Sequence, residues 1–399
     1  MYFYRRHEPT ELPRRKIKFW FVYLLAVIFH YHTLVVSYTS PTYLGDFIDL
    51  KHIGLLYSIG SIGSLLMFIL LPSVLKRFGN VLVTIGLMVI SIGTLAMMGV
   101  GLSAPLVVVG LLLFLVINPL LYLSMDIFSE TLIGKNEGAT GHVRGMTLSL
   151  MSLAALCAPL TISYLVADGD NLAQLYFIAI GVGVLFNLIV IMAFRGFVDP
   201  LYHRVQFGPL LKQCWESKPI KLVLSAHFLV QVFFTWTVVY IPLYLASVLN
   251  MPWSSIGAII AAGLLAYVLF EYPVGILADD YFGEKEMMAV GFLILALTTA
   301  SISFMTTVNI LPWMMLMFVS RIGASLTEVT TESYFFKKVD GQDANLMSIF
   351  RLTRPLAVLG GSLLGSLCLA IMPFHLAFIV LGFVMVIGIF LALGIEDTR

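Results

Sequence analysis

Charged side chains with helical spacing lie inside a long apolar stretch of this 399-residue chain, between Leu311 and Phe336. Arg321, Glu328 and Glu332 are separated there by seven and four residues. At about 3.6 residues per helical turn, these separations place the three side chains within about 20° of one stripe. A carboxylate beside an arginine in a medium of low dielectric constant can bind and release a proton when its surroundings change. The stripe therefore has the residue types that proton-linked chemistry requires.

A second pair of acids occurs about two hundred residues earlier. Asp126 and Glu130 lie four residues apart in the apolar stretch Pro105–Leu132, and their segment aligns with the one that holds Glu328 and Glu332. Each acid inside a membrane costs about 2.5–3.5 kcal/mol on insertion scales, so chance repetition of the pair is improbable. The alignment indicates an internal duplication. It extends to Ile53-Gly54-Leu55 with Ile256-Gly257-Ala258, and to Pro41-Thr42-Tyr43-Leu44 with Pro242-Leu243-Tyr244-Leu245.

The composition identifies the medium in which these acids must sit. Hydrophobic residues make up 60% of the chain and charged residues only 11%, whereas a soluble domain carries about 25% charged residues. A bilayer core needs about 20 helical residues per crossing, and the chain can be divided into twelve such crossings. They are Ile17–Leu44, His52–Leu75, Val81–Gly101, Pro105–Leu132, Val143–Ala167, Leu172–Phe194, Pro219–Leu249, Trp253–Leu277, Met287–Val308, Leu311–Phe336, Ala344–Ile371 and Phe374–Gly394.

The connections between the crossings predict orientation and domain organisation. If both termini are cytoplasmic, nearly all Lys and Arg residues lie on that side and only Lys51 lies outside, as the positive-inside rule requires for an even number of crossings. The first crossing is too long for the apolar region of a signal peptide and lacks a cleavage site, so we expect it to remain as a span. We predict an N-terminal six-helix bundle (residues 1–197), a cytoplasmic linker (198–218) and a C-terminal six-helix bundle (219–399).

The cysteines and the absence of glycosylation sequons give information on the cellular compartment of the protein. Cys157, Cys214 and Cys368 are dispersed, which predicts neither disulfides nor a metal site. No Asn-x-Ser/Thr sequon occurs in the sequence, which is compatible with a bacterial-type inner (cytoplasmic) membrane.

Polar residues are concentrated in particular crossings. The third, sixth and ninth crossings contain no ionisable residue, so they can face lipid. The first, fourth, seventh and tenth are rich in polar groups, which should face the bundle interior or a watery cavity. These groups are His30, His32, Asn118, Asp126, Glu130, His227, Gln231, Arg321, Glu328 and Glu332; the fifth, eighth and eleventh crossings add Arg144, Glu271, Arg351 and Arg354.

With this pattern the chain resembles the major facilitator superfamily, whose best motif, G-x-L-A-D-R-x-G-R-K, follows the second helix. Here that loop, Pro72–Asn80, keeps Arg77 and the second glycine but has Lys76 in place of the Asp. Its echo, Gly275–Lys285, is better preserved and carries one inserted residue. The resemblance implies two pseudo-symmetric six-helix bundles around a central cavity lined by the first, fourth, seventh and tenth helices. It also implies that the loop motif latches the cytoplasmic side, a role that Lys76 puts in question.

Two groups of candidate site residues follow. Those for contact with substrate or protons in the cavity are His30, Asn118, His227, Gln231, Glu271, Arg321, Glu328, Arg351 and Arg354. Those for a cytoplasmic gate are Arg77, Asp126, Glu130, Arg144, Asp279 and Glu332.

Alternatives stay open for both groups. The deeper charges either contact substrate and protons or form a permanently paired network, and the gate charges have either a structural role or a direct part in coupling. Glu271 has no acidic counterpart in the duplication, because Phe68 occupies the equivalent position, and it is a candidate proton carrier. His30 either relays protons or binds substrate, or it is a neutral core histidine.

The sequence as a whole favours an all-α membrane protein with twelve transmembrane helices that works as a secondary active transporter. We expect it to move a small organic solute by alternating access, coupled to protons, as a monomer in the lipid bilayer and without cofactor, metal or nucleic acid. The alternative is a sensor, scramblase or assembly partner that has kept the fold but does not transport. An enzyme is not expected, because no metal-ligand cluster or nucleophile-base spacing occurs in the sequence.

Overall fold

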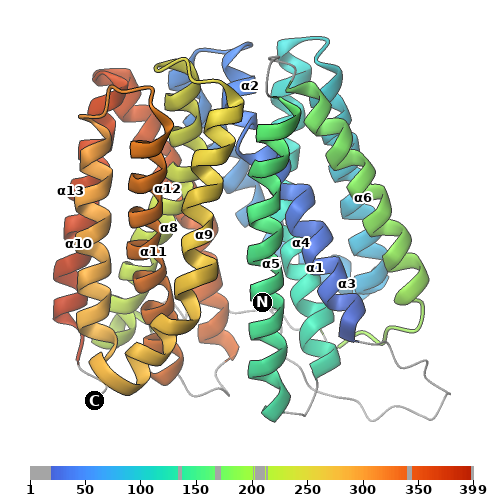
Figure 1. Cartoon of the computed structure of the whole chain (residues 1–399). Coiled ribbons are helices and arrows are strands. Elements are labelled where there is room, and N and C mark those ends of the chain that lie inside the picture. The colour runs from blue at the N-terminus through green and yellow to red at the C-terminus, as the bar shows by residue number, and fades with distance from the viewer. Residues whose placement is uncertain are drawn as a thin grey trace. The chain divides into compact units, whose positions relative to one another are not determined.

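The computed structural model describes residues 19–133, 137–166, 172–200, 202, 212, 214–338 and 344–396. These residues form helices and connecting segments (Figure 1). The helices are α1 (Phe19–Ser37), α2 (Ser40–Gly45), α3 (Leu50–Val100), α4 (Ala104–Ile133), α5 (Glu137–Leu165), α6 (Ala173–Ala193), α8 (Lys218–Ser247), α9 (Trp253–Leu277), the π-helix η1 (Ala278–Phe282), α10 (Glu284–Ile302), α11 (Ile310–Lys338), α12 (Ala344–Ile371) and α13 (Phe374–Gly394).

Ten helical segments in the described part of the chain are long and apolar enough to cross a membrane. The expected number is twelve, and two features account for the difference. Helix α3 is 51 residues long and contains both the second and the third expected crossing. Helix α5 contributes the shorter apolar segment Leu150–Leu165. The predicted all-α membrane architecture is therefore confirmed.

Glycines in the left-handed region of backbone space make the breaks that separate consecutive crossings. Gly79 has φ 76° inside α3, and Gly283 has φ 81° at the start of α10. A residue with a Cβ atom rarely adopts such a conformation, so glycine is required at both turns. Before Gly283, the chain forms η1, closed by a bond from the Gly283 amide to the Ala278 carbonyl. The extra residue in this copy of the loop motif is accommodated by that wider turn.

The described helices group into two compact units that do not follow the halves of the sequence strictly. One unit comprises residues 1–47, 59–158 and 171–205, and the other comprises 48–58, 159–170 and 206–399. In the first unit α1 packs against α4 and α6, around buried aromatic side chains such as Phe29, Phe128 and Phe186.

The second unit contains α8–α13 together with the segments 48–58 of α3 and 159–170, which includes the end of α5. Its helices pack in the pairs α10–α13, α9–α11, α10–α11 and α8–α12. Trp236 donates its indole N–H to the Gly361 carbonyl at 2.8 Å, and Tyr240 donates its hydroxyl to the Ser362 carbonyl at 2.6 Å. These bonds join α8 to α12.

Close contacts between helix backbones hold the segments 48–58 and 159–170 within this unit. A Cβ atom at Gly54 would overlap the Ser362 carbonyl oxygen of α12, and one at Gly257 would overlap the Pro159 carbonyl oxygen of α5. The Ser58 hydroxyl also donates to the Leu359 carbonyl at 3.0 Å. The two glycines, which align in the duplication, therefore both lie where helix backbones nearly touch.

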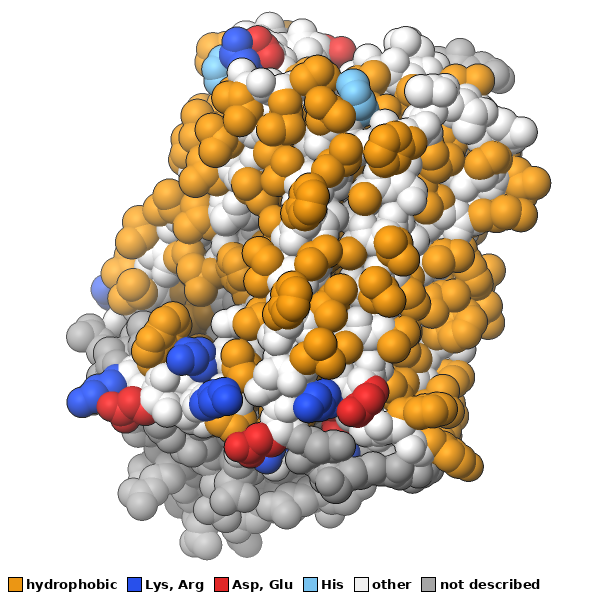
Figure 2. Space-filling model, turned by 90° about the vertical axis from the view of Figure 1, so that its left-hand side faces the viewer, with side chains coloured by type: hydrophobic (Ala, Val, Ile, Leu, Met, Phe, Trp, Pro, Cys, Tyr) orange, Lys and Arg blue, Asp and Glu red, His pale blue; other side chains and the backbone are white. Residues whose placement is uncertain are grey.

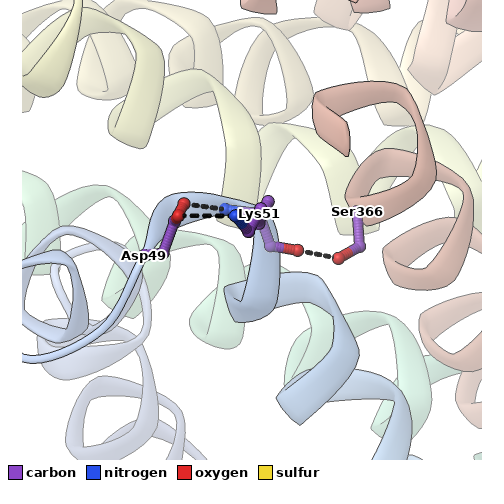
Figure 3. A network of polar contacts seen from close by, with 3 residues as sticks. All are labelled: Asp49, Lys51 and Ser366. Atoms are coloured by element: carbon purple, nitrogen blue, oxygen red, sulfur yellow. Dashed lines mark hydrogen bonds and ion pairs between the residues drawn. The ribbon is translucent and has the colours of Figure 1, made fainter. Parts of the chain in front are cut away.

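A polar contact supplements these approaches next to the start of α3 (Figure 3). The Ser366 hydroxyl of α12 donates to the main-chain carbonyl of Lys51, and the Lys51 ammonium lies 2.9 Å from the Asp49 carboxylate. Hydrogen bonds from Lys51 hold the pKa of Asp49 below its usual value. Both charged side chains are largely exposed, so their pairing contributes little to stability.

The face shown in Figure 2 has the surface expected for contact with lipid. Hydrophobic side chains cover its middle, whereas the Lys, Arg, Asp and Glu side chains gather near the lower edge, with a few at the upper edge. Many exposed side chains of the span-length helices are large and apolar, including Leu297, Phe383 and Phe390. Such exposure is unfavourable in water and suits a hydrocarbon environment.

Candidate functional site

A cluster of polar side chains from α8, α9, α11 and α12 lies within the second unit. His227 and Gln231 are one turn apart on α8 and are both buried. Gln231 Nε2 lies 3.3 Å from His227 Nε2, and the Gln231 side chain also interacts with the Glu328 carboxyl group of α11. His227 Nδ1 lies 3.2 Å from the Thr331 hydroxyl, and its ring stacks on Phe350 at 4.0 Å. Glu328, which lies on the predicted stripe of α11, therefore faces the turn of α8 that holds His227 and Gln231.

Two further carboxyl groups lie close to that of Glu328. Glu332 on α11 and Glu271 on α9 both interact with it electrostatically, and so does the guanidinium of Arg354 on α12. The three acids are half-buried, whereas Arg354 is exposed. Arg351 also has a polar or electrostatic partner in the structure. We name Glu271, Glu328, Glu332 and Arg354, together with His227 and Gln231, the carboxyl cluster.

Arg321 has a different environment, although it shares the stripe with Glu328. It is 5% exposed, and its guanidinium carbon lies 5.1 Å from the centre of the Phe233 ring. Its one hydrogen-bonding neighbour in the described part of the chain is the Ser320 hydroxyl, at 3.4 Å. Arg321 is also not among the groups that interact with Glu328.

In the first unit the polar side chains make short contacts between α1 and α4. The Tyr122 hydroxyl lies 2.9 Å from His30 Nδ1, and the Thr33 hydroxyl donates to the Asn118 side-chain oxygen at 3.1 Å. His30 is partly exposed and Asn118 is buried. These two expected cavity residues therefore belong to α1–α4 contacts.

His32, two residues along α1, is fully buried. Its Nδ1 lies 2.7 Å from the Ala179 carbonyl of α6, and its Nε2 lies 3.2 Å from the Ser91 hydroxyl of α3. One nitrogen must carry a proton to donate to the carbonyl, and the other can accept from the hydroxyl. His32 thus ties three helices together.

The loop motif after the second crossing uses an acid that sequence reasoning missed. The Asp199 carboxylate accepts the main-chain N–H of Asn80 at 2.6 Å and also a hydrogen bond from Tyr202. Asn80 in turn donates from its side chain to the Ser124 carbonyl at 2.9 Å. Asp199 therefore caps the helix that resumes after Gly79, where an anion is favoured by the free amides.

The corresponding position in the second unit also holds an unpredicted pair. Glu284 follows Gly283 and is fully buried, with the Lys337 ammonium 2.5 Å away and the Ser333 hydroxyl donating at 3.0 Å. The signal available in the sequence was an acid directly after a glycine that precedes a helix.

The remaining expected gate charges are only partly described. Arg77 is exposed, and its guanidinium lies 5.2 Å from the Phe78 ring centre. Asp126 is half-buried and has a polar or electrostatic partner. The side chains of Glu130, Arg144 and Asp279 lie outside the described residues. In the described part, no group of three or more His, Cys, Asp or Glu side chains is arranged to hold a metal ion.

Comparisons with known proteins agree with this architecture. The family model of the Major Facilitator Superfamily matches residues 223–399. No curated protein matches the sequence. Among solved structures, the nucleoside transporter NupG matches with a TM-score of 0.70 and 13% identity, over 93% of this chain and 97% of that one.

Two structures of POT family transporters also match. One, in complex with a thioalcohol-conjugated peptide, has a TM-score of 0.75 and 12% identity, over 93% of this chain and 94% of that one. The other, in complex with 5-aminolevulinic acid, has a TM-score of 0.73 and 12% identity, with the same coverage. At such identities the likeness concerns the fold.

The chain is thus a multi-pass helical membrane protein. The resemblance to the major facilitator superfamily is confirmed, by sequence for the C-terminal part and by fold for nearly the whole chain. The comparisons support a membrane transporter.

Proposed function

We propose that the protein is a secondary active transporter that moves a small organic solute by alternating access and is coupled to protons. The observation that carries the proposal is the carboxyl cluster, in which Glu328 meets Gln231, Arg354 and two further acids inside a membrane-spanning unit. Ionisable groups at such depth are costly and mark pathways of ions or substrates.

The cluster contains the parts that a proton-linked step needs. A carboxyl group can hold or release one proton, and its preference changes when a neighbouring arginine approaches or withdraws. Arg354 lies on α12 and Glu328 on α11, so a movement of one helix relative to the other would alter the separation of the two charges. We assign Glu328 as the proton-binding group, with Glu271 sharing the negative charge and the distance of Arg354 setting the proton affinity. Glu332, predicted as a gate charge, is close enough to Glu328 to take part in the same step.

The remaining predictions form part of the same proposal. His30 and Asn118 are proposed substrate contacts of the first unit, and Arg77, Asp126, Glu130, Arg144 and Asp279 are proposed gate charges. We place both termini in the cytoplasm, the protein in a bacterial-type inner membrane, and the domain boundaries at residues 197 and 219. The matched structures include a nucleoside transporter and POT family transporters in complex with a thioalcohol-conjugated peptide and with 5-aminolevulinic acid, which supports a small organic solute.

Reconstituted protein tests the coupling directly. Liposomes loaded with a pH-sensitive dye are exposed to a panel of small organic solutes, and solute-dependent proton flux is measured. We expect Glu328→Gln to reduce this flux at least about tenfold while solute exchange without a pH gradient persists, because the amide cannot carry the proton.

Glu216→Gln is the matched control, because Glu216 is exposed before α8 and, among the residues that the structure describes, its ion-pair partner is Lys212 at 3.8 Å. It should transport like the wild type. Proton flux that survives Glu328→Gln would remove Glu328 from the coupling step. Folded wild-type protein that moves no solute in any condition would favour the non-transporting sensor, scramblase or assembly partner.

A further inference from the structure

We propose that Arg321 binds a carboxylate group of the transported solute. The inference rests on the proposed transport function and specifies the class of solute. It starts from the three mid-membrane arginines, which need a counter-charge of some kind. Arg354 has Glu328 as an electrostatic neighbour, and Arg351 has a partner within the structure. Arg321 is the remaining member of the set.

Arg321 is buried, so the absence of an acidic partner among the described residues is energetically costly. The residue is 5% exposed, and in the described part of the chain no carboxylate lies within ion-pair distance of it. A guanidinium stays protonated in proteins and has five N–H donors. Here the Ser320 hydroxyl, at 3.4 Å, is its single hydrogen-bonding neighbour among the described residues. A buried cation with so few polar partners recovers only a small part of the hydration energy that it loses.

Apolar neighbours contact the stem and one face of the Arg321 guanidinium, whereas most of its N–H groups have no hydrogen-bond acceptor among the described residues. Its guanidinium carbon lies 5.1 Å from the centre of the fully buried Phe233 ring, a contact with the ring face. Its Cγ would lie 3.4 Å from a Cβ atom at Gly263, so the glycine leaves space on α9 for the arginine stem. One turn further along α11, the buried Ser325 hydroxyl has no hydrogen-bond partner in the described part. The Arg321 guanidinium, held against the Phe233 ring, and the Ser325 hydroxyl can therefore both donate hydrogen bonds to a bound anion.

The charge of the site selects the ligand chemistry. A guanidinium binds planar oxyanions through two parallel N–H···O bonds. A single arginine between Phe233, Gly263 and Met317 balances one negative charge, which matches a carboxylate. A phosphate group with two charges would need a second cation, and Arg354 and Arg351 are engaged elsewhere. The site is therefore suited to a monocarboxylate end of a small organic solute.

A binding experiment with purified protein tests this site separately from proton coupling. The melting temperature is measured with paired probes that differ only in the acid: benzoate and benzamide, glutarate and glutaramide, indole-3-acetate and indole-3-acetamide. A ligand that binds the native state raises this temperature. We expect at least one acid to give a larger rise than its amide, and Arg321→Met to abolish that difference. Arg321→Lys should retain part of it, because an ammonium keeps the charge but lacks the planar fork.

Arg195→Met is the matched control, because Arg195 is exposed and its Nε donates to the Ile191 carbonyl within its own helix end. It should keep the full acid preference. Acid binding without any proton flux would contradict the proposed coupling but leave the carboxylate site intact. Equal shifts for all acids and amides, or an acid preference that survives Arg321→Met, would overturn the site.

The melting temperature of unliganded protein gives an independent readout. Arg321→Met keeps an apolar stem and removes a buried charge that has no acidic partner among the described residues, so it should melt at or above the wild-type temperature. A lower melting temperature, or failure to fold, would show that Arg321 has a structural counter-charge and would overturn the proposal. Recovery of transport in a double variant with Glu328→Gln would do the same, because it would identify Glu328 as that counter-charge.

Discussion

Two histidines separated by one residue on α1 have opposite environments. His32 is fully buried between the Ala179 carbonyl and the Ser91 hydroxyl, whereas His30 is partly exposed and meets the Tyr122 hydroxyl. Because successive residues of a helix point about 100° apart, residues two apart lie on nearly opposite faces. One histidine is thus a packing element, and the other is accessible to a ligand.

At the residue scale we predict that His32→Ala destabilises the protein by about 2–4 kcal/mol, since it leaves a cavity and removes two buried polar contacts. The measurement is the midpoint of thermal unfolding in detergent. His30→Ala is the matched comparison, and it should unfold close to the wild-type temperature but transport more slowly. Equal losses of stability in the two variants would contradict the assignment.

Helices α3 and α9 each have, near their start, a glycine that lies against the backbone of another helix, and the internal duplication relates the two positions. Gly54 near the start of α3 and Gly257 near the start of α9 are aligned residues, and each faces a helix backbone. The absence of a side chain lets α3 approach α12 and lets α9 approach α5. The contacts join segments that are about 100 to 300 residues apart in sequence.

The corresponding prediction concerns overpacking. Leucine at Gly54 or Gly257 would force the helices apart, at a cost of about 1–3 kcal/mol, and should reduce solute-dependent proton flux several-fold. Gly86→Leu, in the same helix α3, is the control, because a Cβ atom there meets nothing within 4 Å. If all three variants transport alike, these close approaches have no part in the transport cycle.

For the whole molecule, the distribution of Lys and Arg residues predicts two cytoplasmic termini. The prediction follows because cationic loops are retained on the cytoplasmic side during insertion. A fluorescent protein that folds only in the cytoplasm should therefore be bright when fused after Arg399. Alkaline phosphatase, active only outside, should be active when the chain is truncated and fused after Lys51. The reverse pattern would invert the orientation and imply a miscounted crossing.

Much of the architecture could be predicted from the sequence, because it depends on short-range properties. Apolar stretches of spanning length reflect the cost of placing polar groups in lipid, whatever the helices contact. The spacing of Arg321, Glu328 and Glu332 and the alignment of Gly54 with Gly257 are likewise local or repeated patterns. The twelve expected crossings are consistent with the structure, because α3 joins two of them across the non-helical break at Gly79 and α5 holds the shorter apolar segment Leu150–Leu165.

Partnerships between distant residues were decided by the tertiary structure alone. The sequence placed Arg321 and Glu328 on one stripe, but the fold puts Glu328 among Gln231, Arg354 and two acids and leaves Arg321 against Phe233. It likewise supplied Asp199 to the amide of Asn80, 119 residues away in the chain. Helical periodicity determines the direction of a side chain, whereas its partner depends on which other helix packs there, and hydrophobic patterning carries no information on that choice.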